Sequence, residues 1–216
     1  MRESLNLAIQ HLRKCDPRLA EWIDRIGVLE FPIPPAREPY VALLEIIAHQ
    51  QLAGAAARAI WSRVIGLFED GVPNPKRLVQ MTEEHLRTAG LSRSKALAMK
   101  EICTRVNAGT IPSAALIGQM SDTEIYERLI AVRGIGSWTV DMLMMFTLRR
   151  PDIMPVTDYG VRKGFQVLYR KRALPTPKQL LKLTEKWRPH RSLAALYLWR
   201  IAETAKRPKK KKSLSK

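Results

Sequence analysis

The chain has 216 residues, of which 46% are hydrophobic, so it is long enough for one large domain or two small lobes around a core. Its formal net charge is +17, and seven of the basic residues fall within residues 206–216, so the body of the chain is itself basic and predicts a polyanionic partner such as nucleic acid. No apolar run is long enough to cross a membrane and no signal peptide is visible, which favours an intracellular protein.

Helical periodicity runs through the first half of the chain. Helices are predicted over residues 3–14 and 18–26, the second opened by Asp16-Pro17. The proline-rich segment 31–39 predicts an extended connector. Residues 40–68 predict two helices with a break near residues 52–54, where Ala-Gly-Ala is the soft point, and Pro73 and Pro75 mark a loop.

The second half is predicted to be helical as well. A short helix runs from Thr82 to Gly90 and an amphipathic one over residues 91–109. Ser121 and Glu124 predict a capping box for a helix that continues to about residue 132. After a glycine turn, further helices follow to about residue 149, over residues 158–172, and from about residue 192 to residue 206. The fold class is therefore all-α.

The glycine turn is Gly134-Ile-Gly136, between two predicted helices. Glycine at 134 allows positive φ, and both glycines let the backbone come close to another surface. The N–H groups of Gly136, Ser137 and Trp138 then point out of a helix N-terminus, where a DNA phosphate fits. A plain glycine cap followed by the next helix explains the same residues. A dinucleotide-binding motif is excluded, because its third glycine and preceding strand are absent.

Several segments together resemble the helix-hairpin-helix superfamily of DNA glycosylases, in its alkylpurine (3-methyladenine type II) branch. "LIAVRGIGSWTVDML" is similar to the hairpin, and "DIMPVTDYGVRKG" to the segment with the catalytic aspartate. "DPRLAEWIDRIG", "IIAHQQL", "AGLSRSKA" and "WRPHRSLAALYLW" agree with that branch in the same order and extend the resemblance over most of residues 16–200.

The resemblance implies a two-lobed helical fold with the active site in a cleft between the lobes. One lobe is expected over residues 38–149, ending in the hairpin, and the other over residues 1–37 plus 150–205. Residues 206–216 are expected to be a disordered basic tail, which adds DNA affinity, serves as a nuclear import signal or is incidental. A monomer is expected, in the cytoplasm or nucleoid of a bacterium or the nucleus of a eukaryote.

Asp158 is the catalytic residue that the resemblance implies. From the residues alone it is a helix N-cap, and the two roles are compatible because a helix N-terminus stabilises a carboxylate. Breaking an N-glycosidic bond builds positive charge on the deoxyribose, which a carboxylate stabilises while it helps to deprotonate the attacking water. Asp141, the rival carboxylate in the hairpin's second helix, is assigned a structural role because a negative charge there would oppose DNA.

An aromatic pocket for a flipped base is the second feature that the resemblance implies. An enzyme that acts on a base in a duplex must extrude it, and alkylated purines carry a positive charge that aromatic faces attract. Trp138, Tyr159 and Trp199 fall where the family lines this pocket, with Gln51 nearby. Aromatic residues at helical spacing are also typical of a core. His190, where many relatives have another aromatic residue, leaves the shape of one wall open.

Contacts with the rest of the duplex are expected from two further groups. Leu52, at the soft break, is the expected wedge that fills the gap left by the base, although a buried leucine at a helix end explains it equally. Four basic side chains are expected to touch phosphates, although such residues are often only solvated. They are Arg93, Lys95, Arg162 and Lys163.

No lyase step and no cofactor are expected. Relatives that also cut the backbone use a lysine near the position of Trp138, and tryptophan cannot form a Schiff base. The iron–sulfur cluster of many lyases needs four cysteines, whereas this chain has only Cys15 and Cys103. We expect them to be two buried thiols, with a disulfide between them as the alternative. By resemblance, the hairpin carbonyls can hold a sodium or potassium ion; they belong to residues around Ile130, Val132 and Ile135.

The sequence thus predicts a monofunctional glycosylase that excises alkylated purines, such as 3-methyladenine and 7-methylguanine, from double-stranded DNA. Two alternatives remain open. One is a glycosylase for a neutral deaminated or oxidised base, which usually needs a more polar pocket wall. The other is a DNA-binding module of the same fold without catalysis, against which the carboxylate of Asp158 beside an aromatic residue argues.

Overall fold

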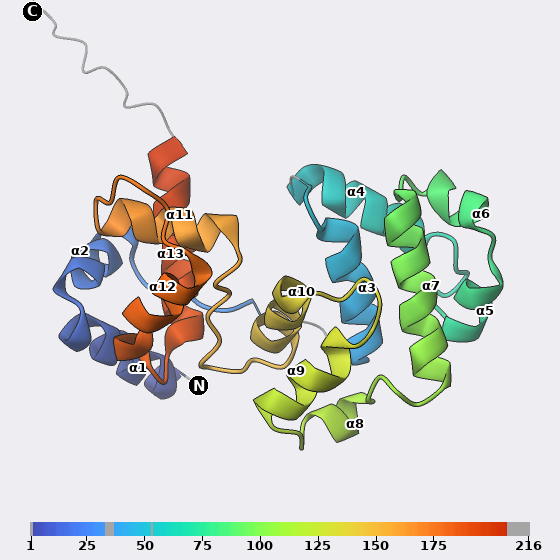
Figure 1. The fold of residues 1–216 in the computed structure, drawn as a ribbon, viewed down its shortest axis with the longest axis horizontal. Coiled ribbons are helices and arrows are strands. Elements are labelled where there is room, and N and C mark those ends of the chain that lie inside the picture. The colour runs from blue at the N-terminus through green and yellow to red at the C-terminus, as the bar shows by residue number, and fades with distance from the viewer. Residues whose placement is uncertain (1, 33–36, 53, 207–216) are drawn as a thin grey trace, which may run out of the picture. The chain divides into compact units, whose positions relative to one another are not determined.

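The computed structural model describes residues 2–32, 37–52 and 54–206, and these ranges contain helices and no β-strand (Figure 1). The predicted all-α class is confirmed. The chain folds as two compact units. The terminal unit comprises Met1–Pro32 and Arg150–Lys216, and the central unit comprises Ile33–Arg149. The predicted tail lies outside the described residues, except for Lys206, which ends the last helix.

The terminal unit joins the two ends of the chain in one helical body. The longest of its helices is α13, against which α11 and α2 pack. In Figure 1, α11 crosses α13. The elements are α1 (Arg2–Cys15), α2 (Pro17–Ile26), α11 (Tyr159–Leu168), α12 (Pro177–Leu183), the 3-10 turn η2 (Glu185–Trp187) and α13 (Arg191–Lys206).

Asp16 ties the N-terminal helices to the C-terminal ones. Asp16 is only 1% exposed, and its side chain caps α2 by accepting a hydrogen bond of 3.2 Å from the N–H of Leu19. It also accepts Nε1 of Trp187 at 2.9 Å, Nζ of Lys186 at 2.9 Å and the hydroxyl of Tyr169. Burial alone would raise the pKa of Asp16, but these hydrogen bonds outweigh it and lower the pKa.

The central unit is built around α3, which is buried along much of its length. The helix α7 packs against α3, and Figure 1 shows α5 and α6 on the side of α7 away from α3. The elements are α3 (Pro39–His49), α4 (Gly54–Ile65), α5 (Pro75–Gln80), α6 (Glu83–Thr88), α7 (Arg93–Asn107), α8 (Ala114–Ile117), α9 (Asp122–Ile130), α10 (Ser137–Met142) and the π-helical turn η1 (Leu143–Thr147).

Three sequence expectations about the helices were wrong. The helix predicted to end at residue 172 ends at Leu168, because Arg170 adopts a φ of 53°. The loop marked by Pro75 contains α5, whose N-terminus is capped by Asn74 with the proline at the first helical position. The helix predicted to run to residue 149 stops at Met142 and continues as the π-helical turn. The break near residues 52–54 is confirmed by the gap between α3 and α4.

Candidate active site

Asp158 lies directly before α11 and caps that helix, as predicted. Its Oδ1 accepts the backbone N–H of Val161 at 2.8 Å and Nε1–H of Trp199, on α13, at 2.8 Å. The first donor is fixed by the helix and the second by a half-buried ring. The carboxylate is therefore held in one orientation by two elements that are far apart in the sequence.

Two glycines of α11 let α13 come close enough for this hydrogen bond. A Cβ at Gly160 would lie 2.6 Å from Cδ1 of Trp199 and 3.1 Å from Oδ1 of Asp158. A Cβ at Gly164 would lie 1.9 Å from the carbonyl oxygen of Leu198, so that no side chain fits there. The glycines are one helical turn apart and face the same neighbour. The spacing Gly-x-x-x-Gly thus sets how near Trp199 stands to Asp158.

Of the other site residues expected in the terminal unit, the aromatic one is exposed and the two basic ones are half-buried. Tyr159 is 60% exposed, directly after Asp158. Nε of Arg162 donates to the carbonyl oxygen of Pro175 at 2.8 Å, and Nζ of Lys163 donates to Oε1 of Gln166 at 2.7 Å. Both of these cationic side chains are half-buried and have partners within the unit.

His190 lies directly before α13 and is in contact with α1. Its ring meets that of His11 edge to face, with 5.3 Å between the centroids. Burial lowers its pKa, the neighbouring His11 lowers it further, and Asp152 opposes both effects.

The Gln50–Leu52 turn connects α3 to α4 in the central unit. Gln51 adopts a φ of 58°, a left-handed conformation that is uncommon for residues other than glycine. Leu52 follows and is 41% exposed. Nζ of Lys95, on α7, donates to the carbonyl oxygens of Ala48 at 2.9 Å and of Gln50 at 2.8 Å. Lys95, which we expected to touch a phosphate, is thus bound to the backbone just before Gln51.

The hairpin between α9 and α10 has the two glycines in different conformations. Gly134 has a φ of +91°, as expected, and a Cβ there would lie 2.4 Å from Cβ of Ala98 on α7. Gly136 is extended, with φ −100° and ψ 174°, and is the N-cap residue of α10, where no side chain caps the helix. Ser137 hydrogen-bonds to Tyr126 across the hairpin. The predicted turn is therefore seated on α7 through Gly134.

A hydrogen bond joins the Gln50–Leu52 turn to the hairpin. Nε2 of Gln50 donates to Oγ1 of Thr139, on α10, at 2.9 Å. Arg93, the other expected phosphate contact of this unit, is exposed at the start of α7 and forms an ion pair with Glu83 at 3.0 Å.

Two other residues of α10 were assigned from the sequence. Trp138 is half-buried in the first turn of the helix, and Asp141 is only 6% exposed. Asp141 also raises the pKa of Tyr126, although burial of that phenol contributes more. This buried position agrees with a structural carboxylate.

The hairpin carbonyls are the candidate ligands for a cation. The helix α9 ends at Ile130, and the last carbonyls of a helix point towards its negative end, which suits a cation. The carbonyl oxygen of Val132 accepts the N–H of Ile135 at 3.0 Å and retains a second lone pair. Elsewhere in the described part of the chain, no three His, Cys, Asp or Glu side chains gather where they could hold a metal ion.

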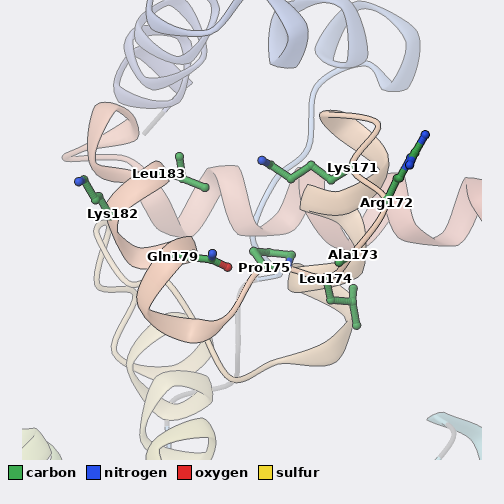
Figure 2. Close-up of a pocket in the computed structure, with 8 residues that line it drawn as sticks. All are labelled: Lys171, Arg172, Ala173, Leu174, Pro175, Gln179, Lys182 and Leu183. Carbon is green, nitrogen blue, oxygen red and sulfur yellow. The ribbon is translucent and has the colours of Figure 1, made fainter.

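A separate hollow of about 550 Å³ lies in the terminal unit, between α12 and the segment that follows α11 (Figure 2). Figure 2 shows Lys171 reaching across the hollow, while Arg172 points away from it. None of the expected site residues lines it, so it is not the expected base pocket. Its lining residues are Lys171, Arg172, Ala173, Leu174, Pro175, Gln179, Lys182 and Leu183.

Three features of the site were not predicted from the sequence. Gly160 and Gly164 had a readable signal, since two glycines four residues apart on one helix favour close helix packing. Gln50 and Thr139 had none, because their hydrogen bond depends on how α3 packs against α10. The contact of Lys95 with the end of α3 could not be predicted either, because it depends on how α7 packs against α3.

The family model described as "HhH-GPD superfamily base excision DNA repair protein" matches residues 44–190. The chain belongs to the HhH-GPD superfamily. The matched range runs from α3 to the start of α13, and so includes the Gln50–Leu52 turn, the hairpin and Asp158. Trp199 lies beyond it. None of the described helices of this HhH-GPD chain is both long and apolar enough to cross a membrane.

Individual HhH-GPD relatives are similar over most of the chain. Identity to DNA-3-methyladenine glycosylase 1 of Schizosaccharomyces pombe is 38% over 180 residues, which cover 81% of this chain and 79% of that protein. A solved structure of S. pombe 3-methyladenine DNA glycosylase in complex with abasic DNA has a TM-score of 0.84 and 35% identity, covering 94% of this chain and 99% of that one. The DNA-3-methyladenine glycosidase of Bacillus halodurans has a TM-score of 0.78 and 33% identity, covering 92% and 90%.

Proposed function

We propose that this chain is a DNA glycosylase that flips alkylated purines out of double-stranded DNA and hydrolyses their N-glycosidic bonds in base excision repair. One observation carries the proposal. In a chain of the HhH-GPD superfamily, a carboxylate is held at the start of a ten-residue helix by two directed N–H donors, from Val161 and Trp199. The names of the similar proteins supply 3-methyladenine as a substrate, and we extend it to the class of alkylated purines.

Asp158 performs the chemistry in this proposal. As the bond between sugar and base breaks, positive charge develops on the deoxyribose, and the carboxylate stabilises it electrostatically. The same carboxylate accepts a proton from the attacking water, whose oxygen forms the new bond to the sugar carbon as the base leaves. Because Val161 and Trp199 fix the orientation of the carboxylate, it needs no reorganisation when the charge develops.

The aromatic residues recognise the base. Trp138, Tyr159 and Trp199 supply π faces, which attract the positive charge of 3-methyladenine or 7-methylguanine, and Gln51 supplies an amide. The exposure of Tyr159 supports this assignment, since a tyrosine buried in a core would not be available to a base. A neutral deaminated or oxidised base would gain nothing from the cation–π attraction.

The DNA duplex is held by the hairpin and opened by the wedge. The exposure of Leu52 and the left-handed turn before it support a side chain that enters the duplex. The backbone at Gly134, Gly136 and Ser137 approaches a phosphate, helped by Arg93, Arg162 and Lys163. If a monovalent cation binds at the hairpin, the carbonyls of Ile130, Val132 and Ile135 hold it and it adds positive charge for that phosphate.

The enzyme lacks lyase activity in this proposal. Trp138 occupies the place where lyases of the family have a lysine, and an indole cannot form a Schiff base with the exposed sugar. The two cysteines of the chain are too few for a four-cysteine iron–sulfur cluster. No cofactor is required for the hydrolysis.

The test is release of free base from methylated duplex DNA by the native chain and by Asp158→Asn. The control is Asp122→Asn, which removes a carboxylate from the start of another helix, α9. We expect Asp158→Asn to lower kcat by about 100-fold or more while DNA binding persists. The control should retain native activity. Release of base without strand cleavage, and without a covalent complex after borohydride, supports the absence of a lyase step.

The same assay separates the alternatives. Duplexes that contain a deaminated or an oxidised base test the neutral-lesion alternative, and preference for either would overturn the alkylpurine assignment. Binding of DNA with no release from any of these substrates would leave only a DNA-binding module.

A further inference from the structure

The Gln50–Leu52 turn has a conformation that its own residues do not favour. The backbone of Gln51, at a φ of 58°, is in the left-handed region, which residues other than glycine, asparagine and aspartate rarely adopt. Such a conformation persists only where the surroundings hold it. The turn also presents Leu52, the proposed wedge, at 41% exposure. The contacts that hold the turn therefore decide where the wedge points.

Lys95 is the principal contact. Its ammonium donates to the carbonyl oxygens of Ala48 and Gln50, which are close to the C-terminal end of α3 and immediately before Gln51. A cation at the C-terminal carbonyls of a helix is favourable, because the helix dipole is negative there. Burial lowers the pKa of Lys95, which agrees with an ammonium that has exchanged water for protein oxygens.

The same helix face also seats the hairpin. Ala98 follows Lys95 by three residues, so the two lie on one face of α7. The backbone at Gly134 approaches Ala98 so closely that a Cβ would lie 2.4 Å from Cβ of the alanine. A direct hydrogen bond of 2.9 Å from Gln50 to Thr139 joins the turn to the hairpin's second helix. The turn and the hairpin are thus joined at two places.

We propose that Lys95 is a positioning residue that, with Gln50 and Thr139, fixes the distance between the Leu52 wedge and the phosphate-binding hairpin. Leu52 then enters the duplex at a fixed distance from the phosphate that the hairpin binds. Binding of the DNA backbone and flipping of the base are thereby coupled. This inference rests on the proposed glycosylase function and assigns to Lys95 a role in flipping rather than in phosphate binding or hydrolysis.

The experiment compares two duplexes that differ in how hard the damaged base is to flip. In one, the methylated purine is paired normally; in the other it lies opposite an abasic site, where no base pair has to be broken. Lys95→Met keeps the aliphatic stem and removes the ammonium. We expect its kcat to fall by about 30-fold on the paired duplex and by about 3-fold or less on the other. Fluorescence of 2-aminopurine beside the lesion should report slower flipping.

Lys100→Met is the matched control. Lys100 is on the same helix, and its Nζ also donates to a backbone carbonyl, that of Met81 at 2.7 Å, away from the Gln50–Leu52 turn. Lys100→Met should flip and excise the damaged base at the rates of the native chain. Lys95→Arg, which keeps the cation, should recover part of the flipping rate. An equal defect in Lys100→Met would mean that α7 has simply been destabilised, and would overturn the proposal.

Two further results would also overturn it. If the kcat of Lys95→Met falls equally on both duplexes while base flipping stays normal, Lys95 acts in the hydrolysis step. Lys95→Met could also bind undamaged DNA more weakly, with normal flipping and with a salt dependence of binding that corresponds to about one phosphate contact fewer. That result would make Lys95 a phosphate ligand. If Lys95→Met does not fold, Thr139→Val removes the second link, and it should show the same preference for the unpaired lesion.

Failure of the underlying function looks different. A native chain that excises neither substrate would refute glycosylase activity itself. Asp158→Asn should lose excision on both duplexes equally while base flipping continues, so a defect in chemistry cannot be mistaken for a defect in positioning.

Discussion

Replacing Gly160 with alanine should slow catalysis without disturbing the helix that contains it. The added Cβ would lie 2.6 Å from Cδ1 and 3.0 Å from Nε1 of Trp199, where ordinary contacts need at least 3.4 Å. The indole ring must therefore move by close to 1 Å. Its hydrogen bond to Asp158, now 2.8 Å long, would then stretch beyond the range of a hydrogen bond.

The expected magnitude follows from that lost hydrogen bond. A hydrogen bond to a charged group contributes about 1.5–3 kcal/mol. If all of it acts in the transition state, Gly160→Ala lowers kcat by about 10- to 150-fold. Alanine favours a helix over glycine by up to about 1 kcal/mol, which offsets part of the steric cost in stability. The assay is single-turnover release of methylated base, with circular dichroism to show that the variant is folded.

A double-mutant cycle with Trp199→Phe decides whether the reasoning is right. Phenylalanine has no N–H, so the hydrogen bond to Asp158 is already absent in that background and Gly160→Ala should cost little more. If Gly160→Ala retains native activity, or if its loss is as large in the Trp199→Phe background, the glycine does not act through this hydrogen bond.

Two other predictions concern buried groups of the fold. Asp16→Asn leaves a buried network without its charge and should lower the free energy of unfolding by about 3 kcal/mol at pH 7. Because the pKa of Asp16 is below its ordinary value of 3.8 in the folded chain, urea unfolding should show this difference shrinking as the pH falls below 3.8. Burial raises the pKa of Cys103 to about 12, so roughly one thiol in ten thousand is ionised at pH 8. Cys15 is only half-buried, contrary to expectation, so the measurement uses Cys15→Ser. In that variant a disulfide reagent should modify Cys103 only after unfolding, and rapid modification of the folded variant would contradict the buried position of Cys103.

Local signals account for the parts of the fold that could be predicted. The helix that starts after Asp16 and the capping box of Ser121 and Glu124 were readable, because a cap depends on residues a few positions apart. The positive φ of Gly134 was readable for the same reason. The early end of α11 was not, because the left-handed conformation of Arg170 has no glycine to mark it.

The internal supports of the candidate site could not be read from the sequence. Trp199 was expected beside the base, but nothing near it indicates that its N–H meets a carboxylate 41 positions earlier in the chain. Lys95 looked like any surface lysine that binds phosphate, and its contact with Ala48 depends on the packing of α7 against α3. The family resemblance, with residue type and spacing, predicts which groups act, and that stays a prediction, whereas tertiary packing determines what holds those groups.

These supports form two sets, each within one unit. In the central unit, Lys95 and Thr139 hold the turn that presents Leu52, the proposed wedge. In the terminal unit, Trp199 and Gly160 hold the carboxylate of Asp158. Base flipping and hydrolysis are consecutive steps, and the sets share no residue, so substitutions should fall into two classes that different assays detect. A change in the first set slows flipping and is relieved by an unpaired lesion, whereas a change in the second slows hydrolysis on every substrate.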